Sequence, residues 1–118
     1  MKLIIAIIRP ERLDAVQSAL QVVLDEDDNY RLTVQPVEGH GRLRGEVEYV
    51  RGQPVRPQMV GRLQLTIAVN DRYVEPTIGA IAHAARSGAG AVGDGKIFVL
   101  PLDDCVRIRT GEHGPTAV

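Results

Sequence analysis

The pattern of apolar and polar positions divides the chain into alternating strands and helices. The continuous apolar run Leu3–Ile8 is typical of a strand that is buried on both faces. Apolar residues then recur at helical spacing, which predicts an amphipathic helix over Pro10–Leu24. The β-prone residues of Leu32–Glu38 predict a second strand, and Pro36 places this strand at a sheet edge or a bulge.

The second half of the chain repeats this order. Apolar residues alternate with polar or small ones over Leu63–Val69, which predicts a strand with one buried face. Helical spacing returns over Asp71–Arg86, and strands are expected at Ile97–Leu100 and Val106–Thr110. The order β-α-β-β-α-β predicts an α+β, ferredoxin-like sandwich with a short extra C-terminal strand. Both helices would cover one face of the sheet, so the second apolar face of Leu3–Ile8 favours an oligomer.

Between the second and third strands, residues 39–61 have no hydrophobic period, because glycine and proline interrupt it repeatedly. A connection of this length inside a compact domain is usually functional or disordered. Its charged residues and Tyr49 suit an arm that becomes ordered on a protein partner. The alternative is a long hairpin loop without a function of its own.

Length and composition narrow the classes of function. A chain of 118 residues predicts one domain, residues 1–118. The net charge of −1 and the aromatic content of 3% argue against a nucleic-acid partner. No apolar run approaches the length of about 20 residues that spans a bilayer, and no cleavage site follows the apolar start. We therefore expect a soluble cytoplasmic protein, in which the lone Cys105 is a small packed hydrophobe.

The first candidate for chemistry is the sequence Gly93-Asp94-Gly95-Lys96, which precedes a predicted strand. Two glycines allow a turn with positive φ that exposes successive N–H groups, and such a concavity can hold a phosphate. Lys96 would stand at its mouth. The alternative is an ordinary Asp-Gly turn before a strand.

A pair of arginines supports the phosphate interpretation. In a strand, alternation would send Arg107 and Arg109 to one face, where two guanidinium groups repel each other unless an anion lies between them. Their planar forks match a polyphosphate. Arg42 is a third candidate cation. A solvated basic edge strand is the alternative.

Catalytic or metal-binding groupings are scarce. His40, His83 and His113 are far apart and have no partner at metal-ligand spacing, and no nucleophile is paired with a base. The sequence therefore predicts a binding protein and not an enzyme, without a metal site. Two rival hypotheses remain: a small acylphosphatase-type enzyme that clamps phosphate with Arg9, and a trimeric metal-binding protein that uses His40 or His113.

With these residues in view, the chain resembles the PII signal-transduction family over nearly its whole length. The most specific matches are the segment at residues 93–98 and the segment at residues 107–112. Further matches are found in Met1–Pro10, in Gly39-His40-Gly41-Arg42 and in Tyr49-Val50-Arg51-Gly52.

The resemblance implies a homotrimer that binds ATP or ADP in three clefts between neighbouring subunits. Residues 41–60 would form the family's T-loop, which docks on a target enzyme or transporter in response to energy and nitrogen or carbon status. By position, the phosphates would be bound by Gly41, Arg42, Gly93, Asp94, Gly95, Lys96, Arg107 and Arg109. The adenosine would be lined by Ile7, Thr33, Gly39, Thr66 and Ala68.

Three departures from the typical pattern concern the effector that is sensed besides the nucleotide and the modification of the T-loop. Leu43 replaces a glutamine that helps to bind the magnesium ion carrying 2-oxoglutarate, and leucine offers no oxygen ligand to Mg²⁺. Arg62 replaces a lysine and could still pair with an effector carboxylate. Val55 stands where many members have a tyrosine that is uridylylated. These changes point to a divergent PII-like member, and bicarbonate is an alternative effector to 2-oxoglutarate.

Overall fold

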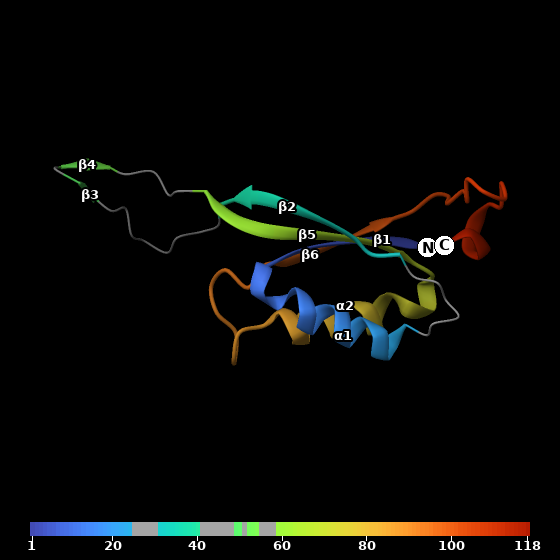
Figure 1. The fold of residues 1–118 in the computed structure, drawn as a ribbon, viewed down its shortest axis with the longest axis horizontal. Coiled ribbons are helices and arrows are strands. Elements are labelled where there is room, and N and C mark those ends of the chain that lie inside the picture. The colour runs from blue at the N-terminus through green and yellow to red at the C-terminus, as the bar shows by residue number, and fades with distance from the viewer. Residues whose placement is uncertain (25–30, 41–48, 51, 55–58) are drawn as a thin grey trace.

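The structure is a computed structural model, and it describes residues 1–24, 31–40, 49–50, 52–54 and 59–118 (Figure 1). Two helices and one main sheet form the body of the molecule (Figure 1). A small hairpin, with two residues in each strand, lies within the predicted T-loop. The elements are β1 (Lys2–Ile8), α1 (Leu13–Val23), β2 (Thr33–Gly39), β3 (Tyr49–Val50), β4 (Gln53–Pro54), β5 (Val60–Val69), α2 (Val74–Ala85) and β6 (Lys96–Pro101).

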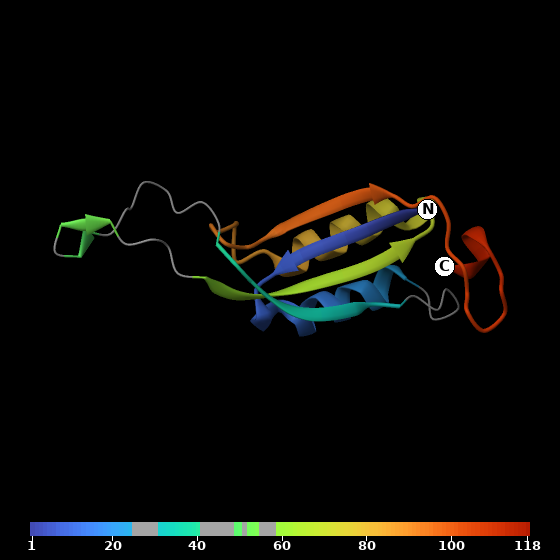
Figure 2. The same ribbon diagram turned by 90° about the horizontal axis from the view of Figure 1, so that it is seen from above.

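The main sheet has the strand order β2-β5-β1-β6, and each neighbouring pair is antiparallel (Figure 2). The two strands that follow a helix, β2 and β6, therefore occupy the edges, and β1 and β5 lie in the centre. This is the topology of the split βαβ arrangement. It confirms the predicted α+β, ferredoxin-like fold.

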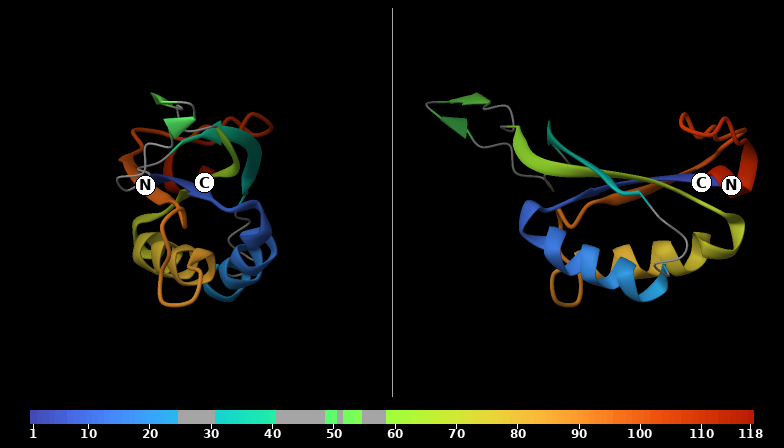
Figure 3. Two further views of the ribbon diagram at one scale, coloured as in Figure 1. Left: turned by 90° about the vertical axis from the view of Figure 1, so that its left-hand side faces the viewer. Right: turned by 45° about the vertical axis from the view of Figure 1, so that its right-hand side comes forward.

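Both helices pack on the same face of the sheet and form the core with it (Figure 3). Alternate residues of β1 and β5 point toward the helices, as the period of two requires. Each fully buried large aliphatic side chain contributes about 1.5–3 kcal/mol relative to an exposed one. The buried side chains of the core are Ile4, Ala6, Ile8, Val16, Leu20, Leu24, Leu65, Ile67, Val69, Ile81 and Ala85.

The opposite face of the sheet, here called the open face, is not covered by the chain's own helices (Figure 1). The strand register places Leu3 beside Leu100 and Ile5 beside Phe98 on this face. Phe98 is 49% exposed and Leu100 is 41% exposed. The apolar row that the sequence predicted for oligomer contact is therefore present and unpartnered in the single chain.

The extra strand predicted over Val106–Thr110 is reduced to one β-bridge, between Val106 and His113. The chain turns over residues 108–110, and Gly111 has a φ of +73°. Asp104 competes for the backbone groups, because its carboxylate accepts the N–H of Cys105 at 2.8 Å and that of Gly114 at 3.1 Å. We call residues 102–118 the C-terminal arm. Within the described residues, this arm forms no ladder with β6.

No helix in the described part of the chain combines the length and the apolar character that a membrane crossing requires. Most of the predicted T-loop, including Gly41, Arg42, Leu43 and Val55, lies outside the described residues.

Candidate functional site: a glycine loop beside the open face

A loop at residues 86–95, here called the glycine loop, joins α2 to β6 and is shaped by Asp94. The carboxylate of Asp94 accepts the backbone N–H groups of Ser87 at 3.1 Å and Ala91 at 2.8 Å. Arg9 adds its Nε to Asp94 at 3.4 Å and donates through Nη2 to the carbonyl oxygen of Val92 at 2.8 Å. The N–H of Ala91, then that of Ser87, lowers the pKa of Asp94 from 3.8 to about 2.

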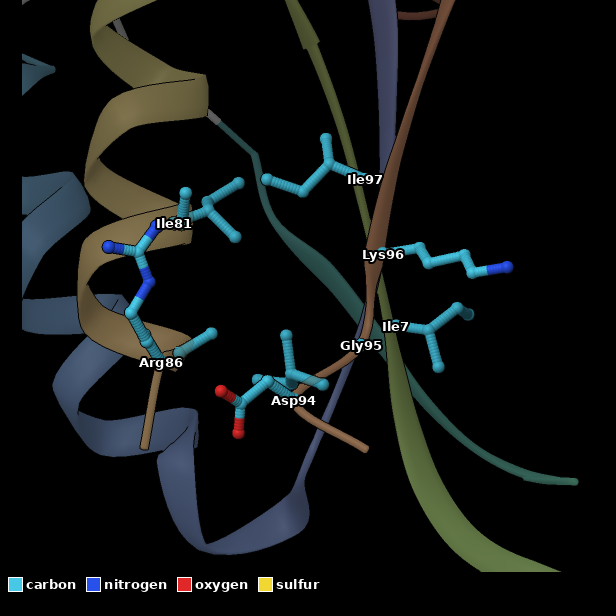
Figure 4. Close-up of a pocket in the computed structure, with 10 residues that line it drawn as sticks. Ile7, Ile81, Arg86, Asp94, Gly95, Lys96 and Ile97 are labelled. Atoms are coloured by element: carbon cyan, nitrogen blue, oxygen red, sulfur yellow. The ribbon is translucent and has the colours of Figure 1, made fainter. Parts of the chain in front are cut away.

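The predicted role of Asp94 was to contact a phosphate, whereas this network gives it a structural role in the loop. Its carboxylate faces away from Lys96 (Figure 4). Its own N–H donates to the carbonyl oxygen of Ala91 at 3.2 Å. Neither group is left for a phosphate in this geometry. We therefore assign Asp94 to holding the glycine loop in shape, and its contact with a phosphate stays a prediction.

Two glycines let the loop lie directly against the sheet. Gly95 has a φ of +110°, and a Cβ at this position would overlap the carbonyl oxygen of Ile7. Gly93 has a φ of +94°, and a Cβ there would lie 3.1 Å from Nη2 of Arg9 and 3.3 Å from Nη2 of Arg62. The close approach and the left-handed backbone both require glycine. The prediction of positive φ at these two positions is confirmed.

Lys96 and the predicted adenosine-binding residues share the open face. Lys96 is paired with Ile7, and Figure 4 shows both side chains pointing away from α2. Thr33 lies directly opposite Thr66 on the neighbouring strand, and Ala68 lies opposite Leu3. Gly39 ends β2 opposite Val60, at the base of the predicted T-loop. The sheet thus brings these residues to one surface, and their contact with adenosine stays a prediction.

The C-terminal arm, which carries both arginines, leaves the sheet at the end of β6 opposite to Lys96 (Figure 2). A strand rises about 3.3 Å per residue, so Lys96 and Pro101 at the two ends of β6 are about 16 Å apart. Beyond Pro101, the C-terminal arm is anchored beside the start of the chain, because Leu102 donates to the carbonyl oxygen of Met1 at 3.2 Å. One chain therefore does not bring Lys96 together with Arg107 and Arg109.

Within the C-terminal arm, the two arginines have different surroundings. Arg107 donates to Oε1 of Glu112 at 3.2 Å and to the carbonyl oxygen of Thr116 at 3.1 Å, which fixes its guanidinium. Arg109 is exposed and makes no hydrogen bond within the described residues. The predicted side-by-side placement on one face of a strand is wrong, because residues 108–110 form a turn.

A second cationic feature is found next to Gly93. Guanidinium nitrogens of Arg9 and Arg62 both lie close to this glycine. Among the described residues, Arg62 donates a hydrogen bond only to the carbonyl oxygen of its neighbour Gly61, at 3.0 Å. Asp94 pairs with Arg9 but not with Arg62 in the described part of the chain, so an anion could bind to the Arg62 guanidinium. The assignment of Arg62 to an effector carboxylate stays a prediction.

The structure also describes the residues on which the acylphosphatase and metal-binding hypotheses rest. Arg9, the clamp of the acylphosphatase hypothesis, is occupied by the glycine loop. His113 contacts Oδ2 of Asp104 at 2.8 Å. This contact is the largest cause that lowers the pKa of the Asp104 carboxyl. Among the described residues, no three His, Cys, Asp or Glu side chains gather as a metal site would require. His40 is exposed.

Sequence reasoning missed the loop-holding contacts of Arg9 and Asp94. A signal for Asp94 was present, since an aspartate inside a glycine-rich turn commonly accepts nearby backbone N–H groups. Arg9 carried no such signal, because its partners are more than 80 residues away in the sequence.

Replacing Asp94 with asparagine is expected to lower stability at neutral pH and to reduce the loss of stability in acid. The folded pKa is about 2 and the ordinary value is 3.8, so the ionised carboxylate stabilises the fold above about pH 4. This contribution disappears as the pH falls through about 2. Circular dichroism at fixed subunit concentration between pH 7 and pH 2 would measure the unfolding midpoint.

The matched control for this experiment is Asp103→Asn, since Asp103 is exposed and makes no hydrogen bond in the described part of the chain. It should follow the parent protein across the whole pH range. An equal acid response in the parent and in Asp94→Asn would contradict the role given to Asp94.

Comparison with known proteins shows which family the chain matches. The model of the family "Nitrogen regulatory protein P-II" matches residues 1–112. The chain is 48% identical over 118 residues to nitrogen regulatory protein GlnK1 of Methanosarcina mazei, covering 100% of this chain and 97% of the relative. It is 42% identical over 118 residues to nitrogen regulatory protein P-II of Rhizobium etli, with 100% of both chains covered.

These relatives are named as regulatory proteins and not as enzymes. The matches span both the glycine loop and the C-terminal arm. The chain belongs to the P-II family of nitrogen regulatory signalling proteins.

Proposed function

We propose that this protein is a homotrimeric sensor that binds ATP or ADP between neighbouring subunits and controls a target enzyme or transporter through its T-loop. The signal would be energy status together with nitrogen or carbon status. One observation carries the proposal: Lys96 begins β6, whereas the C-terminal arm with Arg107 and Arg109 follows the opposite end of this strand, and the sheet face between them is apolar and uncovered. We infer that a second copy of the chain brings them together.

The open face supports the assembly. Leu3, Ile5, Phe98 and Leu100 form its apolar row, and large exposed apolar patches mark interaction surfaces. If three copies meet through these faces, the C-terminal arm of one subunit can reach the glycine loop of the next. The arm would then supply the two arginines to a neighbour's Lys96.

The chemistry of the assembled cleft suits a nucleotide's phosphates. The glycine loop presents backbone beside a lysine, which is a common arrangement for binding phosphate oxygens. Arginine forks add charge-assisted, bidentate hydrogen bonds. On the adjacent open face, Ile7 and Ala68 offer apolar contact, and the hydroxyls of Thr33 and Thr66 offer polar contact to the adenosine.

A second, anionic effector would bind at the base of the T-loop. Arg62, next to Gly93 and Arg9, is the candidate partner of its carboxylate. Both 2-oxoglutarate and bicarbonate carry the required charge. Leu43 offers no oxygen ligand to the magnesium ion that would carry 2-oxoglutarate, which favours the alternative effector.

Calorimetric titration with ATP, ADP and AMP is the direct test of the nucleotide proposal. We expect ATP and ADP to bind with one molecule per subunit, and light scattering to give the mass of a trimer. Absence of heat with all three nucleotides, or a monomeric mass, would overturn the proposal. Hydrolysis of an acyl phosphate in the same preparation would revive the enzyme hypothesis.

A further inference from the structure

A hollow of about 260 Å³ opens on the helix side of the sheet, between the C-terminal end of α2 and the start of β6 (Figure 4). It lies behind the open face, because the side chains of Ile7 and Lys96 point away from it (Figure 4). Asp94 and Arg86 stand at its polar side. Its apolar lining consists of Ile8, Ile81, Ala82, Ala85 and Ile97.

The charges around this hollow do not cancel. The carboxylate of Asp94 is already bound by the N–H groups of Ser87 and Ala91 and by Arg9. The side chain of Arg86 is exposed and makes no hydrogen bond within the described residues. In Figure 4 its guanidinium extends along α2 toward Ile81. The hollow therefore combines apolar walls with a guanidinium that has no carboxylate partner among the described residues.

We propose that this hollow binds a short-chain aliphatic monocarboxylate, with its carboxylate on Arg86 and its alkyl chain against Ile81 and Ile97. Arginine is well suited to a carboxylate because its fork can donate two parallel hydrogen bonds. A volume of about 260 Å³ leaves room for a short alkyl chain, and an acid of six carbons is the probe chosen for it. A neutral alcohol would lack the ion pair, and an amine would be repelled.

Binding here would reach the nucleotide. Gly95 and Lys96 border the hollow and also begin the strand that displays Lys96 on the open face. A ligand behind this backbone would bias its position, and such a coupling acts equally in both directions. This part rests on the proposed function, whereas binding of the carboxylate does not.

Titration of the full-length protein with hexanoate, followed by calorimetry without nucleotide, tests the site. We expect saturable binding of hexanoate, and none of acetate, hexanol or hexylamine in the same range. Arg86→Gln should weaken hexanoate binding at least tenfold, and Ala82→Leu, which fills the hollow, should abolish it. Arg72→Gln is the matched control, because Arg72 lies at the other end of the same helical segment and should leave binding unchanged.

Several results would overturn the inference. Equal binding of acetate would show an ion contact without the apolar site, and unchanged affinity in Arg86→Gln would show that the carboxylate is not recognised. Arg86 is exposed, so this variant remains decisive even if Ala82→Leu fails to fold. Adding hexanoate should also change the Kd of ATP at least threefold. If ATP does not bind at all while hexanoate does, the proposed function fails and the carboxylate site stands.

Discussion

Replacing Arg107 and Arg109 with alanine is expected to weaken ATP binding by about 30- to 150-fold for each arginine. The estimate follows from about 2–3 kcal/mol for a charge-assisted contact with phosphate. In the structure, Arg107 donates hydrogen bonds to Glu112 and to the carbonyl oxygen of Thr116. These contacts hold its guanidinium in place before a ligand arrives. Calorimetry of the two single variants and the double variant would measure the loss.

Two controls make this prediction specific. Arg109→Lys keeps the charge but loses the planar fork, so it should bind ATP with intermediate affinity. Lys96→Ala should also lose binding. If neighbouring chains supply the two halves of each site, trimers that mix Lys96→Ala chains with Arg107→Ala/Arg109→Ala chains should regain one intact site each. Mixed trimers without any recovery would show that the halves do not come from different subunits.

Replacing Gly95 with alanine is expected to destabilise the fold by about 2–6 kcal/mol. A left-handed backbone costs a residue with a side chain about 1–3 kcal/mol, and overpacking adds about 1–3 kcal/mol. Here the obstacle is the carbonyl oxygen of Ile7 in the central strand β1, which cannot move aside as a flexible side chain could. Urea unfolding at fixed subunit concentration would measure the change.

Gly88→Ala is the matched control for this variant. Gly88 has a φ of +56° in the same loop, but no atom lies within 4 Å of the Cβ that alanine would add. We expect only the backbone cost of about 1–2 kcal/mol. Equal losses in the two variants would mean that the contact with Ile7 does not matter. Nucleotide affinity, measured where both variants are folded, should fall only for Gly95→Ala.

The sheet and helices could be predicted because burial imposes a regular period. The alternation over Leu63–Val69 and the apolar run Leu3–Ile8 correspond to β5 and β1, whose inward residues are buried. The same alternation misled at Val106–Arg109, because a period of two predicts a strand only where a neighbour is available for pairing. In the C-terminal arm, Asp104 and two glycines with positive φ organise the backbone instead.

Less of the candidate site could be predicted. Gly93 and Gly95 were recognisable, since their conformation is a local property of the turn. The direction of the Asp94 carboxylate and its contact with Arg9 depend on how the segment between β1 and α1 lies against the glycine loop, which no local pattern records. The separation of Lys96 from the two arginines follows from the register of β6 with β1 and could be seen only once the sheet was assembled.

The low pKa of Asp94 has a consequence for signalling. A carboxylate that titrates near pH 2 remains charged throughout the range that living cells experience. The loop that it organises should then hold the same shape during metabolic acidification. Such a receptor would report its ligands without mistaking a change in proton concentration for a change in nutrient supply.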